Sequence, residues 1–234
     1  MTIDDPLDDL EQHAIKFPGP TLPMAGLRTA LAAVEDELAH ARDQATIRLH
    51  ARHRSDPGRH PDDRELDLYE LQVTLKQILP RVFRGGFVLT LWSVFEVVSK
   101  RMAEYVGARK GDVIAPSQWK QKPLENFLDV VDRVYSRKFG IQAYPDPNER
   151  LQLDQLRELR NALIHHNGSV KGLPEAMSAG GVECYKSRGL DHYTDLHEEF
   201  VIPNADFIRH HFAVVDKYLT SLAERTYEAA HPRP

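Results

Sequence analysis

Apolar residues recur at helical spacing along most of this chain, and this periodicity constrains its fold more than any other feature. Between residues 21 and 50, apolar side chains fall three or four positions apart and so share one face of a helix. They are Leu27, Ala30, Leu31, Val34, Leu38 and Ala41. The same spacing returns in the segments 63–79, 83–107, 123–140, 146–168 and 204–222. The sequence therefore predicts a mostly all-α fold.

Proline and glycine indicate where these helices begin and end. Pro23 suits the first turn of the first helix, and Pro123 would open a helix that ends near Gly140. Asp146–Glu149 combines an N-cap aspartate, a proline and a glutamate at the third position, which is a strong helix start. Pro80 either kinks one long helix or separates two, and the sequence leaves both open.

The pattern changes between residues 180 and 202. Val182 and Cys184 come first, and the apolar run 200–202 follows a polar middle, which predicts a small β-hairpin or flap before the last helix. Residues 1–20 are acidic and end in Phe17–Pro20, so we expect a loosely ordered leader. We expect residues 21–234 to form a single helical domain.

Composition limits the classes of function. A chain of 234 residues with 41% apolar and 28% charged residues has enough core to be globular rather than disordered. Its net charge of −5 means that phosphate binding requires a local basic patch. Cys184 is the only cysteine, which excludes an internal disulfide and fits a reducing compartment. The apolar window 86–98 is too short to span a membrane and contains Glu96, and the N-terminus lacks a signal peptide; we therefore expect a soluble, cytoplasmic protein with no membrane partner.

The end of the helix 146–168 carries the residues best suited to chemistry. In helical projection, one group of side chains lies opposite the apolar stripe of Leu156, Leu159 and Leu163, within an arc of roughly 140°. This group consists of Arg157, Arg160, Asn161, Ile164 and His165. His165 can exchange protons near neutral pH, and Arg160 can hold a phosphate through two parallel hydrogen bonds. These are the two parts that metal-free cleavage of RNA requires. The alternative is a structural one, because Arg and His often cap the last turn of a helix.

The segment 160–168, RNALIHHNG, resembles the motif of the HEPN superfamily, all-α proteins that carry Arg, a polar residue, a short spacer and His. The segment 79–105, LPRVFRGGFVLTLWSVFEVVSKRMAEY, resembles the earlier HEPN helix that packs beside the motif helix and carries an acidic residue. The resemblance covers residues 64–225, and it implies an antiparallel helical bundle.

The resemblance also implies a function. In active HEPN proteins, two subunits form one cleft and cut RNA without a metal or other cofactor, leaving a 2′,3′-cyclic phosphate. His165 would be the acid–base residue, Arg160 the phosphate clamp, and Asn161 would orient His165 or contact RNA. We therefore expect a homodimer with RNA as substrate, acting in stress response or phage defence, with a possible antitoxin or other partner protein. The alternative is a non-catalytic HEPN-like module that dimerises and binds a protein or nucleotide.

Further residues have weaker claims. Glu96 either positions Arg160 or His165 as a carboxylate behind the site or lies on an exposed helix face. Arg157 and Asn167 are candidate substrate contacts. One HEPN subgroup, which pairs with a nucleotidyltransferase antitoxin, has Tyr where this chain has Asn167, so that pairing is not supported. We expect no metal site at His50, His53 and His60, because no carboxylate or cysteine accompanies them at ligand spacing.

Overall fold

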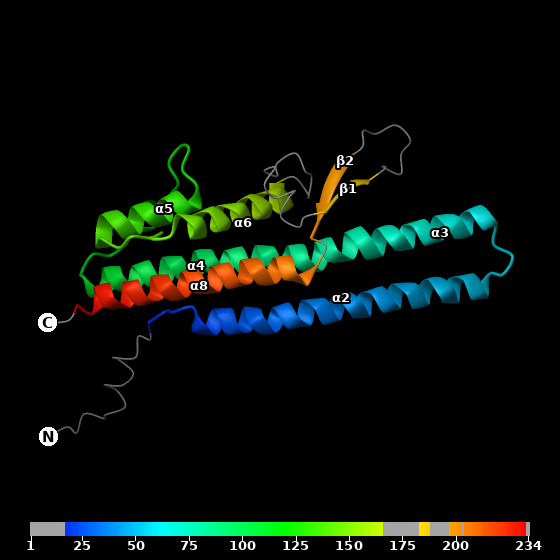
Figure 1. Cartoon of the computed structure of the whole chain (residues 1–234), viewed down its shortest axis with the longest axis horizontal. Helices are drawn as coiled ribbons and strands as arrows, with labels where there is room; N and C mark the ends of the chain where they lie inside the picture. The colour runs from blue at the N-terminus through cyan, green and yellow to red at the C-terminus, as the bar shows by residue number, and fades with distance from the viewer. Residues whose placement is uncertain (1–16, 166–182, 188–196, 203, 233–234) are drawn as a thin grey trace, which may run out of the picture. The chain divides into compact units, whose positions relative to one another are not determined.

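A computed structural model of the chain describes residues 17–165, 183–187, 197–202 and 204–232. Most of these residues are helical, which confirms the all-α class. The α-helices are α2 (Thr21–Ser55), α3 (Pro61–Val73), α4 (Gly86–Arg109), α5 (Phe127–Val134), α6 (Pro147–His165) and α8 (Ala205–Ala230) (Figure 1). The chain divides into two compact units. Unit 1 comprises Met1–Leu22, Phe95–Pro145 and Lys217–Pro234, and unit 2 comprises Pro23–Val94 and Asp146–Asp216.

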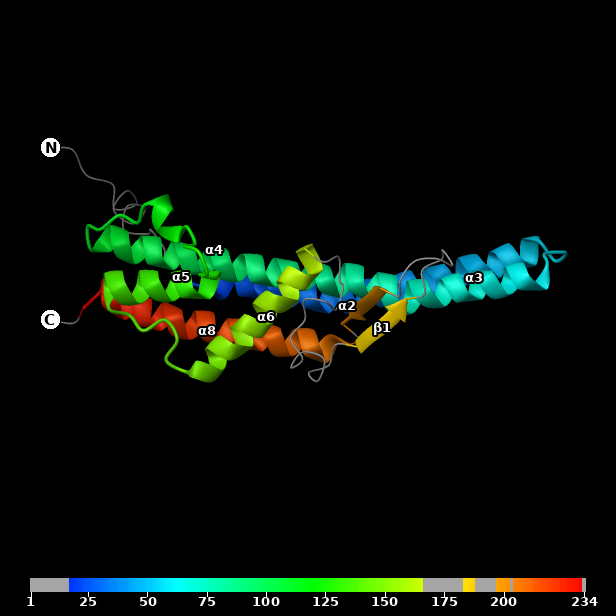
Figure 2. The same ribbon diagram turned by 90° about the horizontal axis from the view of Figure 1, so that it is seen from above.

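In unit 2, α2 and α3 run antiparallel (Figure 1), and α6 lies at an angle to α2 (Figure 2). The loop between α2 and α3 is shorter than the segment 51–62 that the helical spacing leaves open, because α2 continues to Ser55 and α3 begins at Pro61. Arginines at this end of the unit pair with Asp67 of α3. The buried carboxylate of Asp67 accepts hydrogen bonds from Arg52 at 3.0 Å, Arg59 at 2.9 Å and the His53 ring at 3.1 Å. Burial raises the pKa of Asp67, but the hydrogen bond from His53 and the two guanidinium charges outweigh it and lower that pKa. Two of the three histidines therefore have a carboxylate partner: the His53 ring contacts Asp67, one helix further along the chain, and the His60 ring lies 3.6 Å from Asp62.

Pro80 lies inside one continuous helical run, Pro61–Arg109. A π-helical turn precedes it at η1 (Thr74–Ile78) and another follows at η2 (Arg81–Gly85). Pro80 has no backbone N–H to donate, and these wider turns lie on both sides of it. By length and apolar composition alone this run could cross a membrane, but half of its most apolar window is buried inside the protein, and one such helix is weak evidence of a span.

Arg84, in η2, ties three segments of unit 2 together. Its side chain is buried and donates two hydrogen bonds of 2.8 Å to the Glu35 carboxylate on α2. A third, also of 2.8 Å, goes to the backbone carbonyl of Ile202, just ahead of α8. The hydrogen bonds and charge of Arg84 lower the pKa of Glu35 despite its partial burial. Arg84 therefore fixes the end of η2, from which α4 continues.

Unit 1 is built around aromatic side chains. Phe95 contacts the rings of Phe127 and Tyr218, and the buried Tyr135 hydroxyl donates to the carbonyl of Ser99 at 2.7 Å. The helix predicted to start at Pro123 starts instead at Phe127. The physical reason is the backbone at Leu124, whose φ of 70° lies outside the helical region.

Asn126 is the true N-cap of α5, because its side chain accepts from the amide of Asp129 at 3.1 Å. The predicted end near Gly140 is confirmed: after the π turn η4 (Tyr135–Phe139), Gly140 adopts the left-handed conformation with φ of 68°.

Two short strands, β1 (Glu183–Ser187) and β2 (His197–Val201), pair antiparallel, with Glu183 opposite Val201. The residues that join them, and those between α6 and β1, lie outside the described part of the chain. The last helix begins as the sequence indicates, since the Asn204 side chain accepts from the amide of Phe207 at 3.2 Å.

Candidate functional site

Helix α6 carries the Arg–Asn–His segment and starts where the sequence predicts. The Asp146 carboxylate accepts from the amide of Asn148 at 2.9 Å, and Pro147 occupies the first helical position. One face is fully buried in unit 2, formed by Leu153, Leu156, Leu159 and Ala162. Leu163 is only half-buried, so the buried stripe continues from Leu159 to Ala162 and not, as predicted, to Leu163.

The last turn of α6 approaches the end of η2 closely. A Cβ atom at Gly85 would lie 3.2 Å from Cδ2 of Leu163, so the glycine leaves the space that the leucine uses. Gly85 therefore has a packing role: it sets how near α6 comes to the helical run that holds Arg84.

Arg160 and Asn161 are half-buried neighbours on the side of α6 away from the core. Arg160 Nη1 donates to Oδ1 of Asn161 at 3.0 Å. Within the residues that the structure describes, Arg160 forms no ion pair with a carboxylate. The expectation that Asn161 orients His165 or contacts RNA stays a prediction; in the structure its oxygen accepts from Arg160. The amide therefore orients the arginine.

His165 is the last described residue of α6, and its side chain is exposed. In the described ranges no hydrogen bond engages its ring. His166 and the candidate substrate contact Asn167 lie outside these ranges. This exposed imidazole, one turn beyond Asn161, can contact a ligand from solvent.

Arg157 differs from Arg160, although both belong to the same face. Arg157 Nε pairs with the Asp154 carboxylate at 2.8 Å, and its Nη2 also pairs with Glu158. Two carboxylates thus compensate its charge, which counts against its expected role as a substrate contact. Asp154 and Glu158 are close to Arg157 in the sequence, but sequence spacing does not determine the side-chain conformations that pair them with it.

Glu96 belongs to unit 1, whereas Arg160 and His165 belong to unit 2. It is half-buried on α4, and Ser93, one turn earlier, donates its hydroxyl to the carbonyl of Leu89 at 2.8 Å. Both readings of Glu96, a carboxylate behind the site and a plain helix-face residue, stay open predictions.

Across the described ranges, no group of three or more His, Cys, Asp or Glu side chains is placed to hold a metal ion. Among the described residues, the end of α6 offers a guanidinium that contacts an amide and an exposed imidazole. Together they can bind an anion and exchange a proton.

Comparison with known proteins adds no relative: no protein-family model, curated protein or solved structure matches this chain.

Proposed function

We propose that this chain is a HEPN-type, metal-independent endoribonuclease that acts as a homodimer in bacterial stress response or phage defence. The observation that supports it most is the contrast between two arginines on one helix face. Arg157 is compensated by carboxylates. Arg160, in the described part of the chain, is held only by the neutral amide of Asn161. An arginine oriented by an amide keeps its full charge for an anionic ligand.

In the proposed reaction, Arg160 binds the scissile phosphate and stabilises the charge that develops on its oxygens. His165 takes the proton of the ribose 2′-OH or gives one to the 5′-oxygen that leaves. The 2′-oxygen bonds to phosphorus as the bond to the 5′-oxygen breaks. The products are a 2′,3′-cyclic phosphate and a 5′-hydroxyl, and no metal or redox partner takes part.

The proposed dimer explains the polarity of α6. Its core face is formed by leucine and alanine, while Arg160, Asn161, the 46% exposed Ile164 and His165 point away from that core. Two such faces, one from each subunit, would enclose a shared cleft in a HEPN-like antiparallel bundle, with the strands β1 and β2 before the last helix. A defence-system partner or antitoxin would act on this cleft.

The test is RNA cleavage in EDTA by the purified wild type and by the variants Arg160→Ala and His165→Ala. Loss of either side chain should reduce the rate at least about a hundredfold, the usual scale of acid–base or oxyanion contributions. Asn161→Ala should reduce it less, because the arginine remains but is free to turn.

Two exposed residues serve as matched controls: His40 on α2 and Arg101 on α4. Their alanine variants should cleave like the wild type. If the wild type does not cut RNA, or if all variants cut equally, the catalytic proposal fails. A folded dimer that binds RNA or a nucleotide without cutting it would favour the non-catalytic module.

A further inference from the structure

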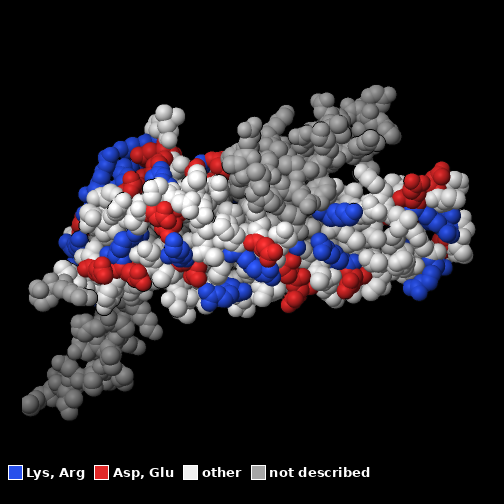
Figure 3. Space-filling model, in the orientation of Figure 1, with Lys and Arg blue, Asp and Glu red and all other residues white. Residues whose placement is uncertain are grey.

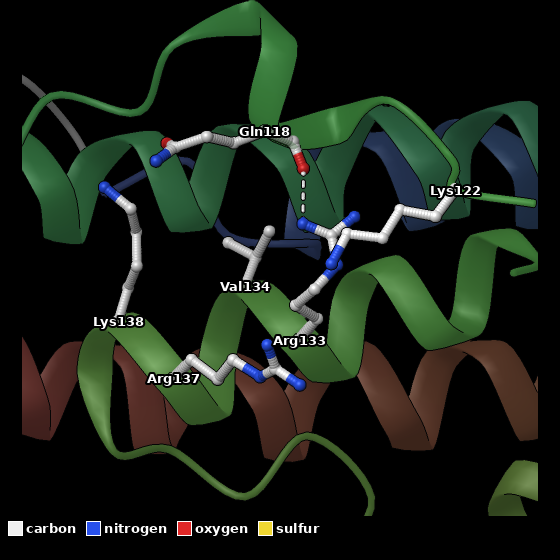
Figure 4. Close-up of a pocket in the computed structure, with 6 residues that line it drawn as sticks. All are labelled: Gln118, Lys122, Arg133, Val134, Arg137 and Lys138. Atoms are coloured by element: carbon white, nitrogen blue, oxygen red, sulfur yellow. Dashed lines mark hydrogen bonds between the residues drawn. The ribbon is translucent and has the colours of Figure 1, made fainter.

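Unit 1 contains a cavity of about 210 Å³ beside α5 and η4. Its lining residues are Gln118, Lys122, Arg133, Val134, Arg137 and Lys138 (Figure 4). Four of them are cations, and among the described residues no carboxylate lines it. Lys and Arg side chains gather over the part of the surface where α5 lies (Figure 3). This is a local basic site in a chain of net charge −5.

Arg133 builds one wall of the cavity. It donates to the backbone carbonyls of Gln118 at 3.2 Å and Lys120 at 3.1 Å. It also forms two hydrogen bonds of 3.1 Å with the Glu125 carboxylate. The backbone amide of Lys122 and the guanidinium of Arg133 together lower the pKa of Glu125, so this carboxylate stays ionised and compensates Arg133.

The same contacts fix the position of Lys122. The amide of Glu125 donates to the Lys122 carbonyl at 3.0 Å, and the positive φ of Leu124 between them is that of a type II turn. The Lys122 amide in turn donates to the Glu125 side chain at 3.0 Å. Lys122 therefore belongs to a hydrogen-bonded turn, and its side chain lines the cavity from there.

The other three cations, Lys122, Arg137 and Lys138, differ in whether a carboxylate pairs with them. Lys138 pairs with Asp112 at 2.8 Å. Arg137 and Lys122 are exposed and, in the described part of the chain, form no ion pair. They reach the cavity from different elements, Arg137 from η4 and Lys122 from the turn before α5 (Figure 4). The charge of Lys122 also acts on the Glu125 carboxylate, but Arg133 already forms two hydrogen bonds with that carboxylate. Cations that line one cavity repel each other, and a bound anion would relieve that repulsion.

We propose that this cavity binds a phosphate group, with Arg137 and Lys122 as its principal contacts. Arginine offers phosphate paired, parallel donors, and lysine offers a point charge. The cavity is smaller than the roughly 300–1,000 Å³ of sites for drug-sized ligands, so it suits one phosphate group. That group belongs either to a free nucleotide or phosphate ion or to the backbone of an RNA strand. The site shares no residue with the proposed cleavage chemistry and does not depend on it.

The test measures binding of three probes at low salt to the full chain carrying His165→Ala, which keeps RNA from being cut. Inorganic phosphate and adenosine 5′-monophosphate are titrated by calorimetry, and a short fluorescent single-stranded RNA by anisotropy. The double variant Lys122→Gln/Arg137→Gln should weaken binding at least about tenfold. With RNA, the dependence of log affinity on log salt should fall by roughly one for each lost phosphate contact.

Arg101→Ala is the matched control, because it removes an exposed cation of the same unit that does not line the cavity. Its affinities should equal those of the His165→Ala parent. Arg137→Lys keeps the charge but loses the paired donors, so its affinity should fall between parent and double variant. Melting temperatures check that each variant is folded.

Binding of phosphate and the mononucleotide without RNA would assign the site to a free ligand, and tighter binding of RNA would assign it to the strand. Both results support the site. It is overturned if the parent binds none of the three probes, or if the folded double variant binds them as tightly as Arg101→Ala does.

Discussion

At the scale of single residues, Arg84 joins three segments of unit 2, and no sequence motif predicted this role. Arg84→Ala removes both hydrogen bonds to Glu35 and the one to Ile202, and leaves the partly buried Glu35 without its hydrogen-bonded cation. We expect the free energy of unfolding to fall by about 3 kcal/mol. Arg84→Lys should recover only part of this loss, because lysine lacks the paired donors.

Denaturant unfolding followed by circular dichroism measures the effect of Arg84. Arg101→Ala is again the control, and an exposed substitution of this kind should change stability by less than about 0.5 kcal/mol. Equal stability of the two alanine variants would show that the Arg84 contacts do not stabilise the fold.

His211 predicts how stability depends on pH. Burial, and to a smaller extent the neighbouring His210, lower its pKa from 6.5 to about 4, so it stays neutral in the folded protein. Below pH 6.5 the unfolded chain binds a proton there and the folded chain does not. Stability from this group is therefore complete above pH 6.5 and falls as the pH drops toward 4. The loss between pH 7 and pH 5 should be about 2 kcal/mol.

His211→Gln should flatten this dependence between pH 7 and pH 5, a range above the pKa values of ordinary carboxylates. The measurement is the free energy of unfolding at each pH. His40→Gln, at an exposed position on α2, should keep the wild-type slope. An unchanged slope in His211→Gln would mean that this histidine titrates alike in the folded and unfolded states.

At the scale of elements, the adjacent glycines Gly85 of η2 and Gly86 of α4 allow the effect of packing on stability to be measured apart from that of helix propensity. A Cβ at Gly86 meets nothing within 4 Å, whereas a Cβ at Gly85 meets Leu163 of α6. Gly86→Ala should stabilise the protein by roughly 0.5–1 kcal/mol, the ordinary gain of alanine in a helix. Gly85→Ala should gain clearly less, because Leu163 has to move. Thermal unfolding compares the two, and equal gains would contradict a close approach of α6 to η2.

The elements also show what the sequence could predict. Signals made by neighbouring residues were reliable: Asp146–Pro147 starts α6, Asn204 caps α8 and Gly140 ends the helical run of α5. The helix start predicted at Pro123 was wrong, because the fixed φ of proline suits a turn as well as a helix start. The turn that forms there includes Glu125, which pairs with Arg133 of α5. The end of α2 depends in the same way on Asp67, which is distant in sequence.

For the candidate site, the spacing of α6 predicted the side on which Arg160, Asn161 and His165 lie. It did not predict which arginine is compensated. That outcome depends on rotamers, as the pairing of Arg157 with Asp154 and Glu158 shows. The basic cavity was missed because its cations are spread over the segment 122–138 and come together only when the turn folds against η4.

At the scale of the whole molecule, the proposed function requires two chains. Light scattering coupled to size exclusion should give twice the mass of one chain. Ile164→Glu places a charge on the exposed apolar position of the motif face and should give a monomer that no longer cleaves RNA. Leu22→Glu changes a residue that is 83% exposed at the start of α2 and should remain dimeric. A monomeric wild type that still cleaves would rule out the shared cleft.

In the proposed reaction, His165 and Arg160 cut RNA through the 2′-hydroxyl of the RNA itself. The most direct measurement incubates the wild type in EDTA with one RNA oligonucleotide and with the same sequence carrying 2′-deoxyribose throughout, and identifies the product ends by mass spectrometry. We predict cleavage of the RNA alone, with 2′,3′-cyclic phosphate and 5′-hydroxyl ends that are absent in His165→Ala. Cleavage of the deoxy strand, or product ends bearing a 5′-phosphate, would contradict the account.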